Sequence, residues 1–148
     1  MATVSNLLKT KQGASKLTVE ASDTVLDALK VMTDSKVGAV LVIENKKIVG
    51  IFTERDYLEK GELVGKCAKT TLVKDLMTKD MYTVRMDTTV EQSMALMDEH
   101  HFRHLPVVED GQMLGILSIR DVLTAVLKNK VREIMGLENY FTASNFLG

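Results

Sequence analysis

An internal duplication constrains the fold of this 148-residue chain more than any other feature of its sequence. When the sequence is shifted by 65 residues, positions 18–58 align with positions 83–123 without a gap, and 12 of the 41 aligned residues are identical. The similarity continues upstream, where 4–8 resembles 73–77. A repeat of this kind indicates two copies of one structural unit that bury their apolar faces together.

Each copy is predicted to fold as β-α-β-β-α. In the first copy, Val25, Ala28, Leu29 and Met32 lie at i, i+3, i+4 and i+7, which is one face of a helix. Two runs rich in β-branched residues follow, with a short polar turn between them, a pattern typical of a hairpin. The strands are predicted at 18–19, 40–43 and 48–53 in the first copy and at 83–84, 105–108 and 113–118 in the second, with a last helix starting near 54 and near 119.

Side chains that can cap a helix precede the first helix of each copy. Positions 22–24 and 87–89 contain only Ser, Asp and Thr, which are favoured N-cap residues. Thr88 and Glu91 have the spacing of a capping box. These residues predict helix starts near positions 25 and 90.

A three-stranded sheet with two helices is too small to cover both of its faces. We therefore predict an α/β (α+β) fold in which the two copies pack against each other about a pseudo-twofold axis. Packing of like with like creates two equivalent clefts at the seam, and ligand sites favour such interfaces. The predicted boundaries are 4–62 for the first unit, 71–128 for the second and 129–148 for a C-terminal tail.

The tail has two interpretations. Its first part continues with apolar residues and fits a helix that covers its own domain. Its end carries Tyr140, Phe141 and Phe146, and exposed aromatic residues also suit a dimer contact or a partner surface.

Composition and charge argue against several classes of protein. The net charge of -1 provides no excess of positive charge to attract nucleic acid or an anionic membrane. No apolar run approaches the roughly 18–20 residues that span a bilayer, and positions 1–11 lack the apolar core of a signal peptide. Cys67 is the only cysteine, so no disulfide can form within the chain, which fits a reducing compartment.

We expect a soluble protein of the cytoplasm or an organellar matrix, with no nucleic-acid or membrane partner.

A short motif that occurs once in each copy is the strongest functional signal. Gly50 is followed by Thr53, Arg55 and Asp56, and the second copy repeats this order at 115–121 with Ser in place of Thr. A hydroxyl where a strand enters a helix stands beside unpaired backbone N–H groups, which can hold a phosphate. A carboxylate one turn later offers two acceptors to the two neighbouring hydroxyls of a ribose, and an arginine can neutralise phosphate charge.

The same motif also has a purely structural interpretation, because a Ser or Thr followed three residues later by an acid stabilises a helix N-terminus by itself. Its duplication favours the ligand interpretation. Gly50 and Gly115 precede it at equivalent positions, and a glycine lets a backbone or a flat base approach the strand closely.

The chain resembles the CBS-pair (Bateman) family. The resemblance rests on the order of elements, the duplicated Gly-x-x-(Thr/Ser)-x-x-Asp ending, the run Arg103-His104-Leu105-Pro106-Val107-Val108 and the lead-in Asp75-Leu76-Met77-Thr78, and it extends from about 4 to 127. The chain looks like the stand-alone CBS-pair proteins of bacteria and plant organelles. The resemblance implies binding of AMP, ADP or ATP, or of NAD or S-adenosylmethionine, and association into flat dimers.

The resemblance also implies roles for individual residues. It implies ribose contacts from Asp56 and Asp121, and phosphate or ribose contacts from Thr53 and Ser118. It further implies that the segments at the first strand of each copy, with residues of the middle strands, clasp the adenine. The complete predicted ligand-binding set is Thr18, Val40, Thr53, Arg55, Asp56, Thr83, Arg103, His104, Leu105, Pro106, Ser118, Arg120 and Asp121.

The two clefts are predicted to be unequal. Where the second copy has Arg103-His104-Leu105-Pro106, the first has Gly38-Ala39-Val40-Leu41 and so lacks the proline and both basic groups. We expect Arg103 and His104 to converge with Ser118 and Arg120 on one cleft that prefers phosphate-rich ligands.

The residues predict neither a metal site nor catalysis. His100, His101 and His104 are close in the sequence, but His104 belongs to the following strand and no carboxylate or cysteine has supporting ligand spacing. Neither copy offers a nucleophile with a histidine and an orienting acid. We therefore expect no enzyme and no catalytic cofactor.

Two functions remain open. The first is a regulatory module that binds an adenosine nucleotide and acts through a protein partner or through its own homodimer. The second is a scaffolding pair of motifs with empty clefts. The retained Asp56 and Asp121 favour the first, because a scaffold needs neither.

Overall fold

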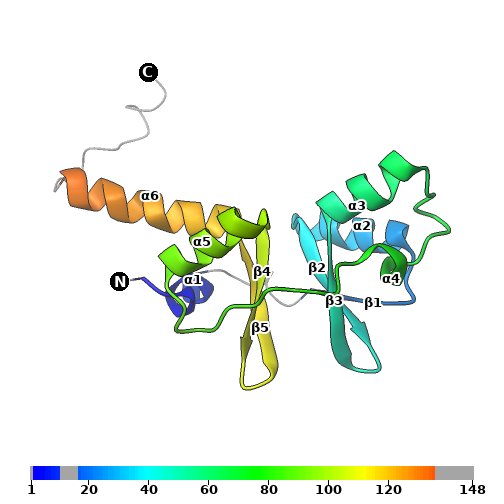
Figure 1. Ribbon diagram of the computed structural model, residues 1–148, viewed down its shortest axis with the longest axis horizontal. Coiled ribbons are helices and arrows are strands. Elements are labelled where there is room, and N and C mark those ends of the chain that lie inside the picture. The colour runs from blue at the N-terminus through cyan, green and yellow to red at the C-terminus, as the bar shows by residue number, and fades with distance from the viewer. Residues whose placement is uncertain (1, 11–16, 136–148) are drawn as a thin grey trace.

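The computed structural model describes residues 2–10 and 17–135 of the chain (Figure 1). The fold is mixed α/β, and the first repeat has the predicted order β-α-β-β-α. Its elements are β1 (Thr18–Glu20), α2 (Val25–Ser35), β2 (Ala39–Glu44), β3 (Lys47–Thr53) and α3 (Glu54–Lys60). The second repeat contains α5 (Val90–His100), β4 (His104–Glu109), β5 (Gln112–Ser118) and α6 (Ile119–Met135). The remaining elements are α1 (Val4–Thr10), a short 3-10 helix η1 (Glu62–Val64) and α4 (Val73–Leu76).

Both predicted hairpins form. β2 pairs antiparallel with β3, and β4 pairs antiparallel with β5. The first turn has φ of 52° at Asn45 and 64° at Lys46, and the second has φ of 52° at Asp110 and 74° at Gly111. Two consecutive residues with positive φ are the mark of a type I′ turn, whose twist matches that of the flanking strands. Figure 1 shows the two hairpins side by side with their turns pointing the same way.

The predicted first strand of the second repeat is only partly correct. β1 pairs in parallel with β2 over three residues, whereas the equivalent segment makes a single bridge between Val84 and Val107. The physical reason lies in two hydrogen bonds of the first ladder that the second lacks. Leu41 N donates to Leu17 O (3.0 Å), but its counterpart Pro106 has no N–H. Ala21 N donates to the backbone carbonyl of Ile43 (2.9 Å), but its counterpart Met86 N donates to the Glu109 side chain (3.1 Å). The second ladder therefore ends early.

Threonine side chains cap the first helix of each repeat. Thr24 Oγ1 accepts a hydrogen bond from Asp27 N, and Thr89 Oγ1 accepts one from Gln92 N. The capping box of α5 consists of Thr89 and Gln92, so the predicted pair Thr88–Glu91 is wrong by one position. Thr88 Oγ1 instead accepts from Arg85 N in the preceding turn.

Each lead-in helix packs on the opposite repeat. Val4 of α1 belongs to the apolar core of the second repeat, and Val73 and Leu76 of α4 belong to the core of the first. Val4 N donates to Thr88 O (2.8 Å), and Val73 N donates to the equivalent Asp23 O (2.9 Å). Figure 1 shows α1 beside the second repeat and α4 beside the first. The boundaries 4–62 and 71–128 stay a prediction about the sequence repeat. The core of each repeat includes one helix that belongs, in the sequence, to the other repeat.

A third apolar cluster joins the two hairpins. Ala39, Leu41 and Ile51 of the first sheet pack with Ile116 of the second, and all four are buried. These residues form the seam between the repeats, and the seam positions the site described below.

Other sequence predictions concern the surface and the chain end. Cys67 is an exposed free thiol in the connection between η1 and α4. The first residues of the predicted tail continue α6 to Met135, and the rest of the tail, 136–148, lies outside the described residues. Among the helices of the described part of the chain, none is both long and apolar enough to cross a membrane.

Candidate functional site

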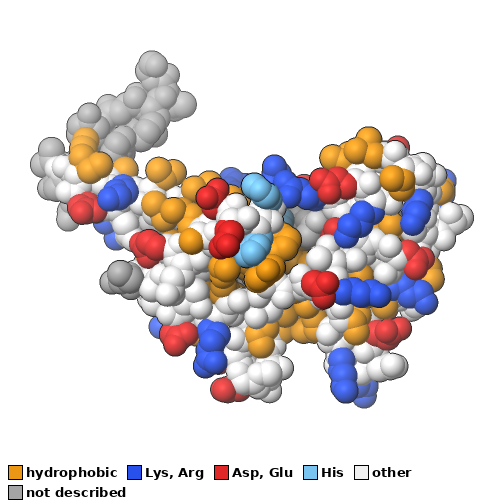
Figure 2. Space-filling model, viewed as in Figure 1, with side chains coloured by type: hydrophobic (Ala, Val, Ile, Leu, Met, Phe, Trp, Pro, Cys, Tyr) orange, Lys and Arg blue, Asp and Glu red, His pale blue; other side chains and the backbone are white. Residues whose placement is uncertain are grey.

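A cavity of about 270 Å³ lies where the two repeats meet. Its walls come from the end of β3 and the start of α3, from the connection after α4, and from the segment between α5 and β4. Six residues of the predicted ligand-binding set line it: Thr53, Arg55, Asp56, Arg103, His104 and Pro106. Figure 2 shows histidine side chains at the middle of this face, with basic and acidic side chains close by at the boundary between the two halves.

The Thr53–Asp56 motif forms a capping box at the start of α3. Asp56 N donates to Thr53 Oγ1 (3.2 Å), and Thr53 N donates to Asp56 Oδ2 (2.9 Å). The structural interpretation of the motif is therefore realised in the first repeat. Ser118 and Asp121 make the same two contacts at the start of α6, at 3.1 and 2.9 Å.

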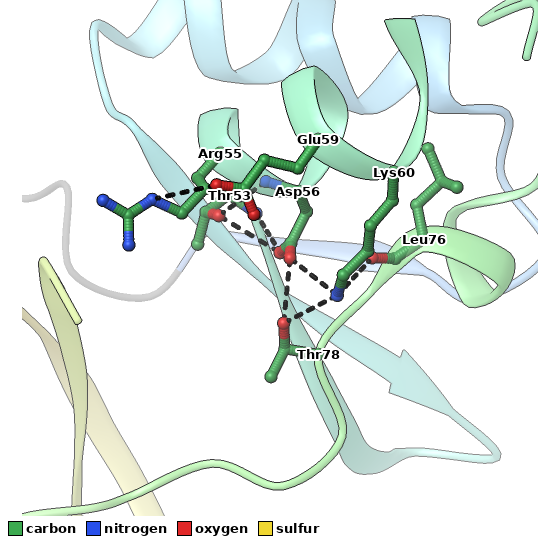
Figure 3. A network of polar contacts seen from close by, with 7 residues as sticks. All are labelled: Thr53, Arg55, Asp56, Glu59, Lys60, Leu76 and Thr78. Atoms are coloured by element: carbon green, nitrogen blue, oxygen red, sulfur yellow. Dashed lines mark hydrogen bonds and ion pairs between the residues drawn. The ribbon is translucent and has the colours of Figure 1, made fainter. Parts of the chain in front are cut away.

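Asp56 has two further partners, one of them from outside its own helix (Figure 3). Its Oδ1 accepts a hydrogen bond from Thr78 Oγ1 (2.9 Å) and forms an ion pair with Lys60 Nζ (2.9 Å). The Asp56 side chain is only 7% exposed, whereas that of Lys60 is 44% exposed. A buried carboxylate needs partners of this kind, because an unpaired buried charge is costly. One wall of the cavity thus holds a carboxylate of fixed orientation.

Arg55 reaches across the seam. Its Nη1 donates to the backbone carbonyl of His101 (2.7 Å) at the end of α5, and its Nε lies 3.8 Å from the Glu59 carboxylate. Arg103 enters the cavity from the opposite repeat. The cavity therefore has a guanidinium from each repeat, and guanidinium groups suit phosphate recognition.

Aromatic rings form part of the second repeat's wall. Tyr82 stacks on His100 with ring centroids 4.0 Å apart and an interplanar angle of 20°, and Phe102 lies 5.5 Å from Tyr82. On the opposite wall, a Cβ added to Gly38 would stand 3.3 Å from ring atoms of His104. The absence of a side chain at Gly38 therefore leaves room for the His104 ring.

Several predicted residues lie elsewhere. Val40 and Leu105 are fully buried in the cores of the first and second repeats, respectively, so their side chains do not line the cavity. Thr18 and Thr83 are exposed, at the start of β1 and just before the bridge at Val84. Neither is a lining residue of this cavity.

The predicted grouping of the basic residues is seen only in part at this cavity, although His104 and Ser118 are register partners in the β4–β5 ladder and Ile119 N donates to Arg103 O (2.8 Å). Arg103 and His104 share the cavity with Thr53 and Asp56 of the other repeat, and Ser118 and Arg120 do not line it. The reason is the packing about the seam, which sets the strand entry of one repeat against the helix start of the other. If the repeat forms the predicted second cleft, the 65-residue relation pairs Ser118, Arg120 and Asp121 with Gly38 and Ala39 there.

The predicted set omitted several residues that line the cavity, among them Lys60, Thr78, Tyr82 and His100. Lys60 lies four positions after Asp56, a spacing that predicts an ion pair on one helix face, so this contact was readable from the sequence. Thr78 and Tyr82 carry no local signal, because their contacts join segments far apart in the chain. His100, considered from the sequence only as part of a metal cluster, lines the cavity. In the described residues, no three His, Cys, Asp or Glu side chains are grouped as a metal site requires.

Comparisons with known proteins agree on one family. A family model described as CBS domain matches residues 14–62 and 73–128. The chain is similar to the mitochondrial CBS domain-containing protein CBSX3 of Arabidopsis thaliana, with 40% identity over 146 residues, covering 93% of this chain and 71% of that protein. A solved structure of a Burkholderia ambifaria protein with CBS domains matches with a TM-score of 0.84 and 37% identity, over 96% of this chain and 99% of that one. The structure of CBSX2 in complex with AMP matches with a TM-score of 0.70 and 31% identity, over 88% and 99%.

Proposed function

Because this chain belongs to the CBS-domain family and carries a tandem pair of CBS motifs, we propose that it is a regulatory module that binds an adenosine nucleotide in the cavity at the seam. The proposal rests on one observation above all. The Thr53–Asp56 motif of the first repeat and the basic pair Arg103-His104 of the second face the same 270 Å³ space. Neither repeat alone supplies this combination.

The chemistry of the cavity matches the three parts of a nucleotide. The Asp56 carboxylate suits a ribose diol, because it presents two acceptor oxygens. Arg55 and Arg103 can hold phosphate oxygens with charge-assisted hydrogen bonds. Tyr82 and Pro106 provide apolar surface for a purine. AMP is the first candidate, since the similar CBSX2 structure is described as an AMP complex, and ADP, ATP, NAD and S-adenosylmethionine remain candidates for the same cavity.

The scaffolding function keeps one observation in its favour. Asp56 is already satisfied by contacts within the chain, so its presence is explained by stability alone. This alternative does not explain why Arg103 and His104 face the same cavity, and we therefore rank it second.

A thermal-shift screen distinguishes the two functions. We expect AMP or ATP to raise the melting temperature by about 5–10 °C at ligand concentrations near 100 times Kd, because a ligand bound only to the folded state stabilises it by mass action. Arg103→Ala is expected to reduce this shift for both nucleotides, and Arg132→Ala, an exposed arginine toward the far end of α6, serves as the matched control. No shift with any of AMP, ADP, ATP, NAD or S-adenosylmethionine would favour the scaffold.

We further propose that the module acts as a homodimer that forms through α3 and α6. Leu58 and Leu123 occupy equivalent positions in the two repeats and are 51% and 45% exposed, and Leu127 lies one turn after Leu123. Figure 1 places both helices along the same edge of the molecule. An apolar surface that the repeat itself duplicates suits a twofold, self-complementary contact with a second copy.

The dimer is tested by light scattering. Wild type is expected to have twice the monomer mass at micromolar concentration, and Leu123→Glu/Leu127→Glu is expected to be monomeric, because burying the two new charges without partners is costly. Leu63→Glu, which alters an exposed leucine of η1 outside this surface, is the control. A monomer mass for the wild type would contradict the proposal.

The same proposal explains how ligand binding is passed on to a second copy or to a protein partner. A ligand that binds across the seam changes the relation between the repeats, and a dimer or a regulated protein partner can respond to that change. We infer the cytoplasm or an organellar matrix as its compartment, in keeping with the mitochondrial description of the Arabidopsis relative.

A further inference from the structure

The acceptor capacity of Asp56 is completely used within the chain. Oδ2 accepts from Thr53 N (2.9 Å) and Thr53 Oγ1 (3.1 Å), and Oδ1 accepts from Thr78 Oγ1 and Lys60 Nζ, both at 2.9 Å. A carboxylate offers about four lone-pair positions. A ribose can therefore reach this carboxylate only if one of the present donors leaves.

Among these donors, Lys60 is best placed to leave. The two Thr53 contacts belong to the cap of α3, and the Thr78 backbone is fixed to β3 by hydrogen bonds with Ile51 at 2.8 and 3.0 Å. The Lys60 side chain is the more exposed partner of the ion pair and is held only by its ammonium group. That group also donates to Thr78 Oγ1 (3.2 Å) and Leu76 O (3.3 Å), so its three protons all have acceptors (Figure 3).

The second repeat lacks this lysine. The residue equivalent to Lys60 is Ala125, although Asp121 matches Asp56 and Ser118 matches Thr53. The two capping boxes are alike, whereas a lysine one turn after the acid is a property of the first repeat alone. Lys60 also lines the cavity together with Arg55.

We propose that Lys60 is a specificity-determining residue. As an internal counter-ion of Asp56, it makes the cavity between the repeats select phosphorylated nucleosides over unphosphorylated ones. This inference rests on the proposed function. A ribose diol displaces the ammonium from Asp56, and the displaced ammonium then binds the phosphate beside Arg55. Adenosine must break the same ion pair and offers the ammonium no new anion. Release of Lys60 also removes its contacts to Leu76 and Thr78 in the connection between the repeats.

The test compares adenosine and AMP by titration calorimetry in the full chain. In Lys60→Met, which keeps the length and apolar stem of the side chain, the preference for AMP over adenosine is expected to fall about tenfold, because one charged hydrogen bond to phosphate is lost, whereas removing the competitor for Asp56 strengthens the binding of both ligands alike. Lys60→Arg is expected to retain most of the preference. Lys47→Met, which removes an exposed lysine at the start of β3, is the control for net charge.

Each outcome decides the inference. A preference in Lys60→Met within twofold of wild type, or a loss that Lys47→Met reproduces, overturns it while leaving the proposed function intact. Failure of the wild type to bind either ligand overturns both. Ala125→Lys supplies an independent check in the second repeat, where a gain in AMP preference supports the inference and binding of both ligands unchanged from wild type contradicts it.

Discussion

Replacing Asp56 with alanine is expected to weaken adenosine nucleotide binding by about 10- to 100-fold, the equivalent of roughly 1.5–3 kcal/mol for a lost charged hydrogen bond. It is also expected to lower the free energy of unfolding by about 1–3 kcal/mol, since the change removes a helix cap and leaves the Thr53 amide and the Thr78 hydroxyl without their acceptor. The loss of stability stays below that of a fully buried ion pair because Lys60 remains partly in water.

Calorimetry at a temperature where the variant is folded separates the two effects. Asp121→Ala is the matched variant in the second repeat, where the same capping box is present. It is expected to reduce binding at the second cleft and to leave the first cleft unchanged. Nucleotide affinity unchanged in both single variants and in the double variant would remove the ribose assignment.

Replacing Gly50 with alanine is expected to destabilise the protein by about 2–4 kcal/mol, the range for overpacking combined with lost backbone hydrogen bonds. A Cβ at this position would stand 2.8 Å from the backbone carbonyl oxygen of Thr78 and 2.9 Å from Met77 Sδ. Met77 can rotate away, but the carbonyl is fixed because Ile51 N donates to it at 3.0 Å. The connection between the repeats must therefore leave β3, which also carries the Thr78 hydroxyl away from Asp56.

Urea denaturation measures this effect, with Gly38→Ala as the comparison. The Cβ of Gly38→Ala would meet the His104 ring at 3.3 Å, and a side chain can shift at smaller cost than a paired backbone. We expect Gly38→Ala to lose less than about 1.5 kcal/mol, as tolerated core changes do. If both variants lose the same free energy of unfolding, the close approach of Thr78 to β3 is not the cause of the loss in Gly50→Ala.

The sequence alone determined the repeated unit and its local structure. The alternation and turn residues around Asn45 and Asp110 predicted both hairpins, and the spacing of Thr53 and Asp56 predicted a helix cap that the structure contains. These features depend on residues within four positions of each other or on one hairpin ladder. The sequence therefore carries them directly in its pattern.

The tertiary structure alone decided how the two units combine. Nothing in the sequence around Val4 or Val73 indicates which repeat each helix covers, and each covers the opposite one. The same packing places Arg103 and Thr53, from opposite repeats, in one cavity, a combination that the sequence did not predict. It also brings Thr78 to Asp56. The Asp56 carboxylate, predicted to bind a ligand, therefore already accepts a complete set of hydrogen bonds from within the chain. Two similar units have similar apolar faces, so their local patterns cannot specify which face meets which; the path of the connecting chain and the fit of side chains at the seam make that choice.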